Sequence, residues 1–576
     1  MKLNKFFLFS AAVGLALASC SDDVDNRVDN GKDVKGDTYV SLSVELAAQG
    51  GTRAAGDEAS SEVGEFVGEG GERNVAKLRF LMDDEKLDMT YVGNTYYEGL
   101  GIDAMDGKSF YKWNATTDSY VTGIWETQES TAAKAMNIIL NAPGEGAASK
   151  TAVDAARALA NTEIDTKDNL AMIADFASAD GFTMTGTKLS KPIFKKTKQE
   201  VYDGTDESAN NFKFNVTRVL SKGVVVYNIA DGDETVKAGT VTLGKIAKGE
   251  DDITFSGKNG ATKFYLFDGE GKSAIAGSTY AASPADAATQ GLFRMSNLAT
   301  QYAAKNSKQV SEVKNEDLAA AYQAKKAVAL AGGFTAATQL EGKAGVYFFE
   351  NTADSYTGDN MLHGYDRFAT AKVYVTFTPA EVYSYDDDDF ITKEAYEVLD
   401  DATVEQTLGK DAYRAVEYKS DATNKTTVYL KKAAELKKNT SYAVGKTYVL
   451  GQQTGKFYAN KQSAIADNNT TAVTYANGRG GYQALWNVKA LDDQKNPTNA
   501  ETWRNSIYVL EINGFAGIPF AWDPSDPNDP NLPETPGDDK PNVDDNPGQG
   551  SATYMRVKAT VLNWKVSKRK VNLGEY

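Results

Sequence analysis

Residues 38–46 carry the pattern that most constrains what this chain can fold into. Apolar and mostly polar side chains alternate along the segment, and one face would carry Val40, Leu42, Val44 and Leu46. Such alternation predicts a half-buried β-strand, because successive side chains of a strand point to opposite faces. Arg53 and Ala54 follow within a stretch of small residues, which predicts an exposed bond for an arginine-specific protease. Cleavage there would remove a strand that the fold itself uses, and the sheet would need a replacement.

The segment before this strand predicts export. A short basic start and an apolar run close on Leu17-Ala18-Ser19-Cys20, the order that is typical of a secretory signal peptide, here residues 1–19. Its last four residues resemble a lipobox, in which a signal peptidase cuts before a cysteine that carries a diacylglyceryl group. Cys20 is therefore the predicted lipidation site, and residues 20–53 are the predicted propeptide. An ordinary signal peptide that happens to contain cysteine is the alternative.

Composition narrows the class of protein. The 576-residue chain has a formal net charge of −17, which argues against nucleic acid and anionic membrane surfaces as partners, because both repel an acidic protein. A hydrophobic content of 41% supports real cores, and 30 Tyr and 24 Phe favour strands. Cys20 is the only cysteine, so no intramolecular disulfide can form and core burial must hold the fold.

Residues 519–550 contain eight of the 13 prolines, together with many Asp and Asn. Proline fixes φ and removes a backbone donor, so this segment predicts an extended tether. Strand-like alternation resumes in residues 551–576, the predicted donor strands. One face would carry Met555, Val557, Ala559 and Val561, and the opposite parity continues with Leu562, Trp564 and Val566. This change of parity predicts a bulge or bend after Val561.

Two β-rich domains are predicted between the propeptide and the tether, residues 54–208 and 209–518, with a boundary close to Ser208. Strands are predicted at residues 76–82, 182–186, 212–219, 223–227, 373–377, 427–430 and 507–512. Helices are predicted at residues 151–160, 169–177 and 312–330, a loop at 191–211, and a turn at Asn477-Gly478. The sequence has no fixed-period repeat, which argues against a solenoid or propeller.

Catalytic chemistry has little support in these residues. His363 is the only histidine, so no multi-histidine metal site can form, and neither a Gly-x-Ser-x-Gly motif nor a phosphate-binding loop accompanies it. A carboxylate pair for glycoside hydrolysis stays an alternative in so acidic a chain. The four aspartates Asp386–Asp389 lack the spacing and glycine of a calcium loop, so a solvated acidic turn is predicted. We expect no catalytic residue, no metal site and no cofactor.

The lipobox, the strand before Arg53, the two β domains and the C-terminal strands resemble the fimbrillins of Bacteroidales, and among them the shaft subunits of the short (minor) fimbriae. The resemblance implies a mainly β fold with a few helices, built as two tandem transthyretin-like Greek-key β-sandwiches. It also implies an outer-membrane lipoprotein precursor, acylated (palmitate) at Cys20 and cleaved outside the cell between Arg53 and Ala54. Arg27 and Arg73 are further candidates for cleavage, so the choice of Arg53 depends on its place after the alternating strand.

The same residues predict how such a subunit would assemble. Cleavage after Arg53 would free residues 38–46 from their groove, and the C-terminal strands of a neighbour would enter by β-strand addition. The predicted function is a structural pilin of a cell-surface fimbrium shaft that supports adhesion and biofilm formation. The predicted partners are further copies of the chain, anchor and tip subunits, the arginine-specific protease, and host or bacterial surface receptors. A glycan-binding surface lipoprotein is the alternative, but it leaves the cleavable strand and the tether unexplained.

Overall fold

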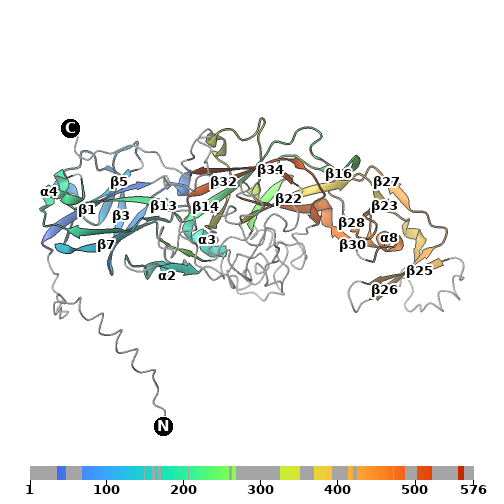
Figure 1. Cartoon of the computed structure of the whole chain (residues 1–576), viewed down its shortest axis with the longest axis horizontal. Helices are drawn as coiled ribbons and strands as arrows, with labels where there is room; N and C mark the ends of the chain where they lie inside the picture. Colours follow the sequence, from blue (N-terminus) through green and yellow to red (C-terminus); the bar gives the residue numbers. More distant parts are fainter. Residues whose placement is uncertain are drawn as a thin grey trace, which may run out of the picture.

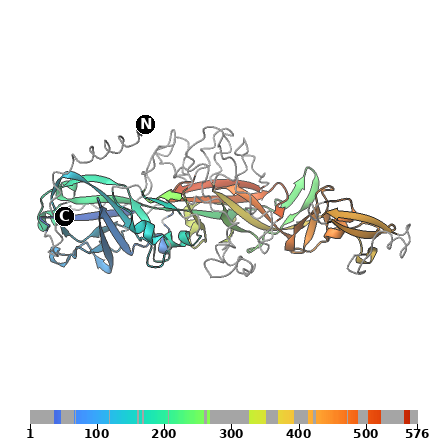
Figure 2. The same cartoon turned by 90° about the horizontal axis from the view of Figure 1, so that it is seen from below.

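The structure is a computed structural model. It describes residues 36–46, 66, 68–117, 119–147, 149–158, 162–165, 170–204, 206–258, 263–267, 325–350, 369–391, 413–419, 425–470, 472–486, 502–521 and 555–563. These residues form a mainly β protein with a few short helices, which confirms the predicted fold class. Figure 1 and Figure 2 show the sheets following one another along the long axis of the molecule.

The first body is a ten-stranded sheet whose pairings return on themselves. Its strands are β1 (Thr38–Leu46), β2 (Lys77–Met82), β3 (Glu85–Tyr96), β4 (Ser109–Lys112), β5 (Ser119–Thr122), β6 (Trp125–Thr127), β7 (Ser130–Leu140), β11 (Met184–Gly186), β12 (Leu189–Ile193) and β13 (Asn211–Arg218). The order β11-β13-β1-β5-β4-β3-β2-β7 closes through a further pairing of β11 with β7. Closure leaves few free edges, which protects a sheet from pairing with other chains.

The β2–β3 hairpin illustrates how the sequence forms these strands. Leu78 and Phe80 are buried on one face, while Arg79 points to the other face and pairs with Asp88, its cross-strand neighbour (Nε–Oδ1 2.6 Å). Asp83 begins the turn between the strands with φ of 48°, a left-handed conformation that short polar side chains tolerate. The strand predicted at residues 76–82 is therefore confirmed.

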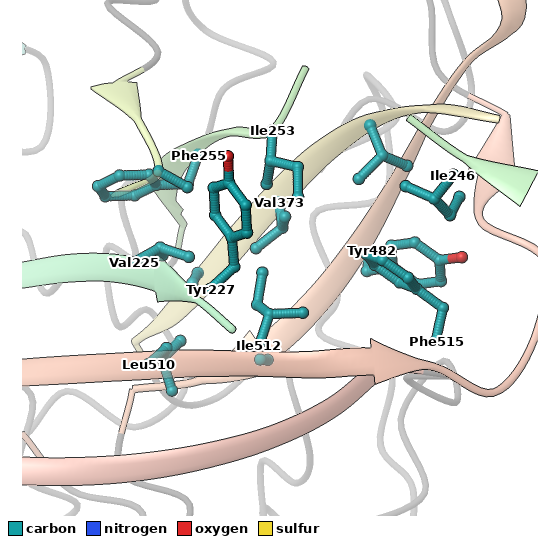
Figure 3. Packing of buried hydrophobic residues seen from close by; sticks show 14 of the residues in the cluster. Val225, Tyr227, Ile246, Ile253, Phe255, Val373, Tyr482, Leu510, Ile512 and Phe515 are labelled. Carbon is teal, nitrogen blue, oxygen red and sulfur yellow. The ribbon is translucent and has the colours of Figure 1, made fainter. Parts of the chain in front are cut away.

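The second body consists mainly of two sheets. One contains β14 (Leu220–Tyr227), β20 (Val328–Ala329), β21 (Val346–Phe349), β32 (Ser506–Phe515) and β34 (Met555–Asn563). The other contains β15 (Thr235–Ala238), β16 (Val241–Ile246), β17 (Thr254–Lys258), β19 (Lys325–Lys326), β22 (Thr370–Pro379), β31 (Arg479–Leu485) and β33 (Phe520–Ala521). Figure 3 shows their shared core, where Val225 of β14 and Leu510 and Ile512 of β32 lie near Val373 of β22.

Two smaller sheets extend the molecule at the end opposite the first body (Figure 1). They are formed by β23 (Val382–Ser384), β27 (Lys437–Asn439), β28 (Tyr448–Gly451), β29 (Phe457–Tyr458) and β30 (Ala472–Tyr475), and by β24 (Phe390–Ile391), β25 (Tyr413–Lys419) and β26 (Lys425–Lys431). The helix α8 (Lys461–Ala466) buries Ala464 and Ile465 against them. Tyr448 and Tyr475 stack with ring centroids 4.9 Å apart and belong to the core of the second body, so this end is continuous with it.

The chain passes from the first sheet to the second at Val219. β13, which follows the predicted boundary at Ser208, still belongs to the first sheet, and β14 begins the second. One apolar cluster spans both bodies, with Leu81 and Ile139 on one side and Val224 on the other. The short strand β8 (Glu163–Asp165) also pairs with β18 (Lys263–Tyr265), which follows the passage to the second sheet. The passage therefore lies later than predicted, because the periodicity of a strand does not say which sheet it joins.

The helices of the described residues are short and differ from several expectations. They are α2 (Lys150–Asp154), α3 (Leu170–Phe176), α4 (Lys198–Asp203) and α8. After α3, β9 (Ala177–Ser178) and β10 (Gly181–Phe182) pair as a two-stranded sheet. α3 confirms the helix predicted at 169–177, and Asn477 and Gly478 form the predicted turn with positive φ. No helix within the described ranges is long and apolar enough to cross a membrane.

Three local predictions are wrong for identifiable reasons. The helix predicted at 151–160 ends at Asp154, and Ala156 and Ala158 are instead buried in the shared core. The end of the helix predicted at 312–330 is strand, because β19 and β20 pair with β17 and β14. The loop predicted at 191–211 contains the end of β12 and all of α4, whose Thr197 cap and Glu200 form a capping box.

A buried ion pair ties the segment that follows the predicted propeptide to the second sheet. The 3-10 turn η1 (Gly70–Glu72) presents Glu72, whose Oε1 accepts hydrogen bonds from Lys222 Nζ and Tyr347 Oη, both at 2.6 Å. The side chains of Glu72 and Lys222 are only 6% and 4% exposed. Burial, together with the Glu72 carboxylate, raises the pKa of the Tyr347 phenol far above its ordinary value, so the hydroxyl remains a donor. This segment is thus held independently of β1.

Glu72→Gln should lower the free energy of unfolding by about 3–5 kcal/mol, because it leaves the Lys222 charge buried without its counter-ion. Urea unfolding followed by tryptophan fluorescence measures the effect. Glu207→Gln is the matched control, since Glu207 pairs with Lys191 at 2.6 Å but is 45% exposed. Exposed pairs contribute about 0–1 kcal/mol. Equal effects of the two substitutions would contradict a structural role for the buried pair.

Candidate functional site: the strand β1 and the slot that holds it

β1 occupies a central position in the first sheet (Figure 1). On one side it runs parallel to β13, from the pair Ser41↔Asn211 to the pair Leu46↔Val216. On the other side it pairs antiparallel with β5, where Val44 faces Tyr120, and with β6. We call the space between β13 on one side and β5 and β6 on the other the β1 slot. Loss of β1 would expose unpaired backbone on both walls of this slot.

The inward face of β1 belongs to the core of the first body. Val40, Leu42, Val44 and Leu46 are 2%, 0%, 0% and 5% exposed. Their cluster includes Leu78, Phe80, Phe110, Tyr120, Met136, Ile138, Phe212 and Phe214. The strand lies at the predicted residues, and the four predicted side chains are all buried. The slot is therefore apolar at its floor.

The end of the slot that holds the beginning of β1 is polar. Thr38 is fully buried, and its Oγ1 donates to Phe194 O at 2.6 Å and accepts from Lys196 N at 2.8 Å. Asn210, in a left-handed conformation with φ of 59°, donates from Nδ2 to Tyr39 O at 2.9 Å and accepts from Phe194 N at 2.9 Å. These contacts select a hydroxyl side chain at the first position of the strand.

The outward face of β1 is partly covered. Tyr39 packs against a small cluster that contains Met105, Ile124 and Val201 of α4. Ser41 is 2% exposed and its hydroxyl contacts Asn211 Oδ1, while Glu45 forms an exposed ion pair with Lys213 at 2.6 Å. Burial on this face is therefore greatest at Ser41, and Tyr39, Ser43 and Glu45 are half-buried.

β34 has a different position in its own sheet. Among the described strands it pairs only with β32, antiparallel, from Ser506↔Asn563 to Phe515↔Met555, and so forms an edge strand of the second body. The predicted tether would hold the C-terminal strands away from both domains, whereas in the single chain β34 is part of the second body. The irregularity in pairing lies between Ile512 and Gly514 of β32, whereas β34 continues through Leu562 without the predicted break. Trp564 and Val566 lie outside the described residues.

Comparison with known proteins gives structural neighbours only. No family model matches the chain, and no curated protein matches it in sequence. A fimbrilin (FimA) from Porphyromonas gingivalis is 13% identical and has a TM-score of 0.34, over 93% of this chain and 100% of that one. A putative cell adhesion protein from Parabacteroides distasonis is 10% identical, with a TM-score of 0.37 over 92% and 100% of the two chains. The tip fimbrial protein Mfa3 from P. gingivalis, with C-terminal truncation, is 10% identical, with a TM-score of 0.31 over 91% and 100%.

These structural neighbours are fimbrial and cell-adhesion proteins of Bacteroidales. Their TM-scores are below 0.5, so any functional conclusion must come from the strands of this chain.

The other predicted site residues lie partly inside and partly outside the described part of the chain. Cys20, Arg53, Ala54, Arg27 and His363 lie outside the described residues. Arg73 is half-buried at the end of η1, where its backbone N–H donates to Gly70 O at 3.2 Å, so it is less accessible than predicted.

The acidic residues 386–389 lie next to lysines. Asp386 pairs with Lys437, and Asp389 pairs with Lys431 at 3.6 Å. Among the residues that the structure describes, no group of three or more His, Cys, Asp or Glu side chains could hold a metal ion.

Asn210→Ala should destabilise the uncleaved protein by about 2–4 kcal/mol. The substitution removes the hydrogen bonds to Tyr39 O and Phe194 and places alanine at a φ of 59°. Asn210→Gly separates the two causes, because glycine adopts this φ freely but also lacks the side chain. Thermal unfolding of the three proteins measures both. If Asn210→Gly is as stable as the wild type, the side chain does not anchor β1.

Proposed function

We propose that this chain is a structural subunit of a cell-surface fimbrium, with no enzymatic role, that assembles by strand exchange. The proposal depends on a difference between two strands that both alternate apolar and polar residues: β1 lies inside its sheet, whereas β34 lies at the edge of its sheet. β1 is a core strand that stands just before the Arg53–Ala54 bond, whereas β34 has a single neighbouring strand. A removable central strand and an edge strand on the same chain are the two parts that strand exchange needs.

The sequence of events follows from these two strands. While Thr38–Leu46 remain attached, they fill the slot of their own subunit. Cleavage after Arg53 makes this strand a dissociable peptide, while η1 keeps the following segment on the second sheet through Glu72 and Lys222. The C-terminal strand of another subunit then enters the slot, where it has strands on both sides instead of one.

Burial stabilises the donor in the slot. Its inward side chains are methionine, two valines and alanine, and the first three at roughly 1.5–3 kcal/mol each, with a smaller contribution from alanine, give about 5–10 kcal/mol before ordering costs. The leaving strand also buries four inward side chains, two of them leucine, so the exchange proceeds because cleavage removes the covalent attachment of this strand and lets it diffuse away. Phe520–Ala521 form β33, so the tether begins later than predicted, and a donor that stays connected to its own subunit through residues 522–550 links the two subunits.

The geometry of the two strands favours a filament. β1 lies in the first body, and β34 lies on a sheet of the second body (Figure 1). Because donor and acceptor occupy different parts of the subunit, the contact is heterologous and does not close on itself. The proposed role is that of a shaft subunit, because the chain carries both a donor segment and a removable strand. We further propose export as an outer-membrane lipoprotein through Cys20, and anchor and tip subunits, the protease and surface receptors as partners.

Electron microscopy of the full-length protein before and after an arginine-specific protease tests the proposal. We expect monomers before cleavage and filaments after it. Complete cleavage after Arg53 without filaments, or filaments of uncleaved protein, would contradict strand exchange. Lipidation is tested separately by labelling with a fatty acid, and label that persists in Cys20→Ala would contradict Cys20 as the acylated residue.

A further inference from the structure

We propose a specific register for the exchanged strand: residues 553–561 of a neighbouring subunit replace residues 38–46 position for position in the β1 slot. This inference rests on the proposed function and adds the residues that recognise the donor. Both segments begin with Thr-Tyr, Thr38-Tyr39 and Thr553-Tyr554. Both then carry apolar side chains at the same alternate positions, which gives the pairs Val40/Met555, Leu42/Val557, Val44/Ala559 and Leu46/Val561. The donor would therefore run parallel to β13, as β1 does.

The buried polar end of the slot selects this register. Thr38 Oγ1 satisfies Lys196 N–H and Phe194 O, at 2.8 and 2.6 Å. Departure of β1 leaves both groups without this hydroxyl, and a partly buried N–H group that loses its partner costs free energy. Thr553 supplies the same hydroxyl on the same backbone geometry. Thr-Tyr also occurs elsewhere in the chain, for example at Thr447-Tyr448, where Tyr448 begins β28. The dipeptide alone therefore does not determine the register.

A shift of two residues in either direction places a polar side chain in the core. In one direction Thr553 would take the place of Val40, which is 2% exposed. In the other direction Asn563 would take the place of Leu46, and Met555 would take the place of Thr38. A shift of one residue would turn the whole apolar face outward. Among parallel registers within two residues of it, only the proposed register keeps the floor of the slot apolar and its polar end satisfied.

One outward position fits this register, and the other requires rearrangement around the donor. Tyr554 takes the place of Tyr39 against Met105, Ile124 and Val201. Arg556 takes the place of Ser41, which contacts the acceptor Asn211 Oδ1, so a donor group is retained there. The larger side chain needs space beside α4, but a shift of two residues would bring Tyr554 or Lys558 to the same position. Ser41 therefore does not discriminate between registers.

Cysteine cross-linking reads the register directly. Lys213 is exposed and lies opposite Ser43 in the β1–β13 pairing, so in the proposed register it faces Lys558 of the neighbouring subunit. We compare three full-length double variants, in which Lys213→Cys is combined with Arg556→Cys, Lys558→Cys or Thr560→Cys. Opposite residues of paired strands lie within reach of a disulfide, whereas residues two positions away lie beyond it. Filaments form under reducing conditions and are then oxidised.

The expected result is a ladder of covalent oligomers with Lys558→Cys and little with the two matched controls. A stronger ladder with Arg556→Cys or Thr560→Cys would overturn the register while leaving strand exchange in place. Filaments that cross-link at none of the three positions would overturn the register and the C-terminal donor together. These two failures are therefore distinguishable.

Thr553 provides a second test that does not depend on disulfide geometry. Thr553→Val keeps the shape of the side chain and removes the hydroxyl, whereas Thr553→Ser keeps the hydroxyl. We expect subunits of Thr553→Val to leave preformed filaments at least about tenfold faster than wild-type subunits. Thr553→Ser should change this rate by no more than about threefold. Equal rates for Thr553→Val and the wild type would show that the polar end of the slot does not bind Thr553.

Discussion

Arg53→Ala protein should remain uncleaved, folded and monomeric, with filament formation reduced to background. The physical reason is the covalent connection between β1 and the body that it completes. An attached strand acts at an effective concentration on the order of mM, and it returns to the slot before a donor from another subunit can replace it. Gel filtration and electron microscopy of protease-treated protein measure the outcome. Filaments of Arg53→Ala that still contain residues 38–46 in the same chain would contradict the account.

Two controls separate cleavage from other effects of this substitution. Arg73→Ala changes another arginine that follows the strand and should still be cleaved and assemble. Replacement of residues 50–53 by the recognition sequence of an unrelated site-specific protease should restore assembly, but only when that protease is added. Failure of this rescue despite complete cleavage would mean that Arg53 acts by some means other than release of β1.

Val557→Asp should reduce filament yield about a hundredfold or more. In the proposed register Val557 takes the place of Leu42, which is fully buried, and a carboxylate there has no partner. Thr560→Asp is the matched control with the same charge on the other face. It takes the place of Glu45, which pairs with Lys213 at 2.6 Å, so it should assemble at least as well as the wild type. Similar losses in both variants, measured by sedimentation of filaments, would contradict the assignment of the inward face.

Sequence periodicity predicted the strands of this protein well. β1, β2, β13, β22 and β32 lie at the expected residues, because alternation of apolar side chains reflects burial on one face. Alternation of apolar side chains also predicted the buried face of β1, since all four of its inward residues are in the core. It also found the turn at Asn477-Gly478, where positive φ favours these residue types.

Features that depend on distant contacts could not be predicted in this way. Nothing in the local sequence shows that Asn210 anchors Tyr39 and Phe194, because these residues are far apart in the chain. The pairing of β34 with β32 and the continuation of the first sheet through β13 could not be predicted for the same reason, because both depend on contacts between distant parts of the chain. The end of the helix expected at 312–330 is strand, because β19 and β20 pair with other strands and tertiary contacts outweigh the helix propensity of alanine. Residues 312–324 lie outside the described residues.

A reconstruction of the assembled filament by electron cryomicroscopy tests the central claim most directly. The decisive feature is the strand between β13 and β5 in each subunit. Strand exchange in the proposed register requires this strand to be continuous with the tether of the neighbouring subunit, with Val557 at the position of Leu42 and Thr553 beside Lys196 N. A filament in which residues 38–46 of the same subunit still occupy the slot would contradict it.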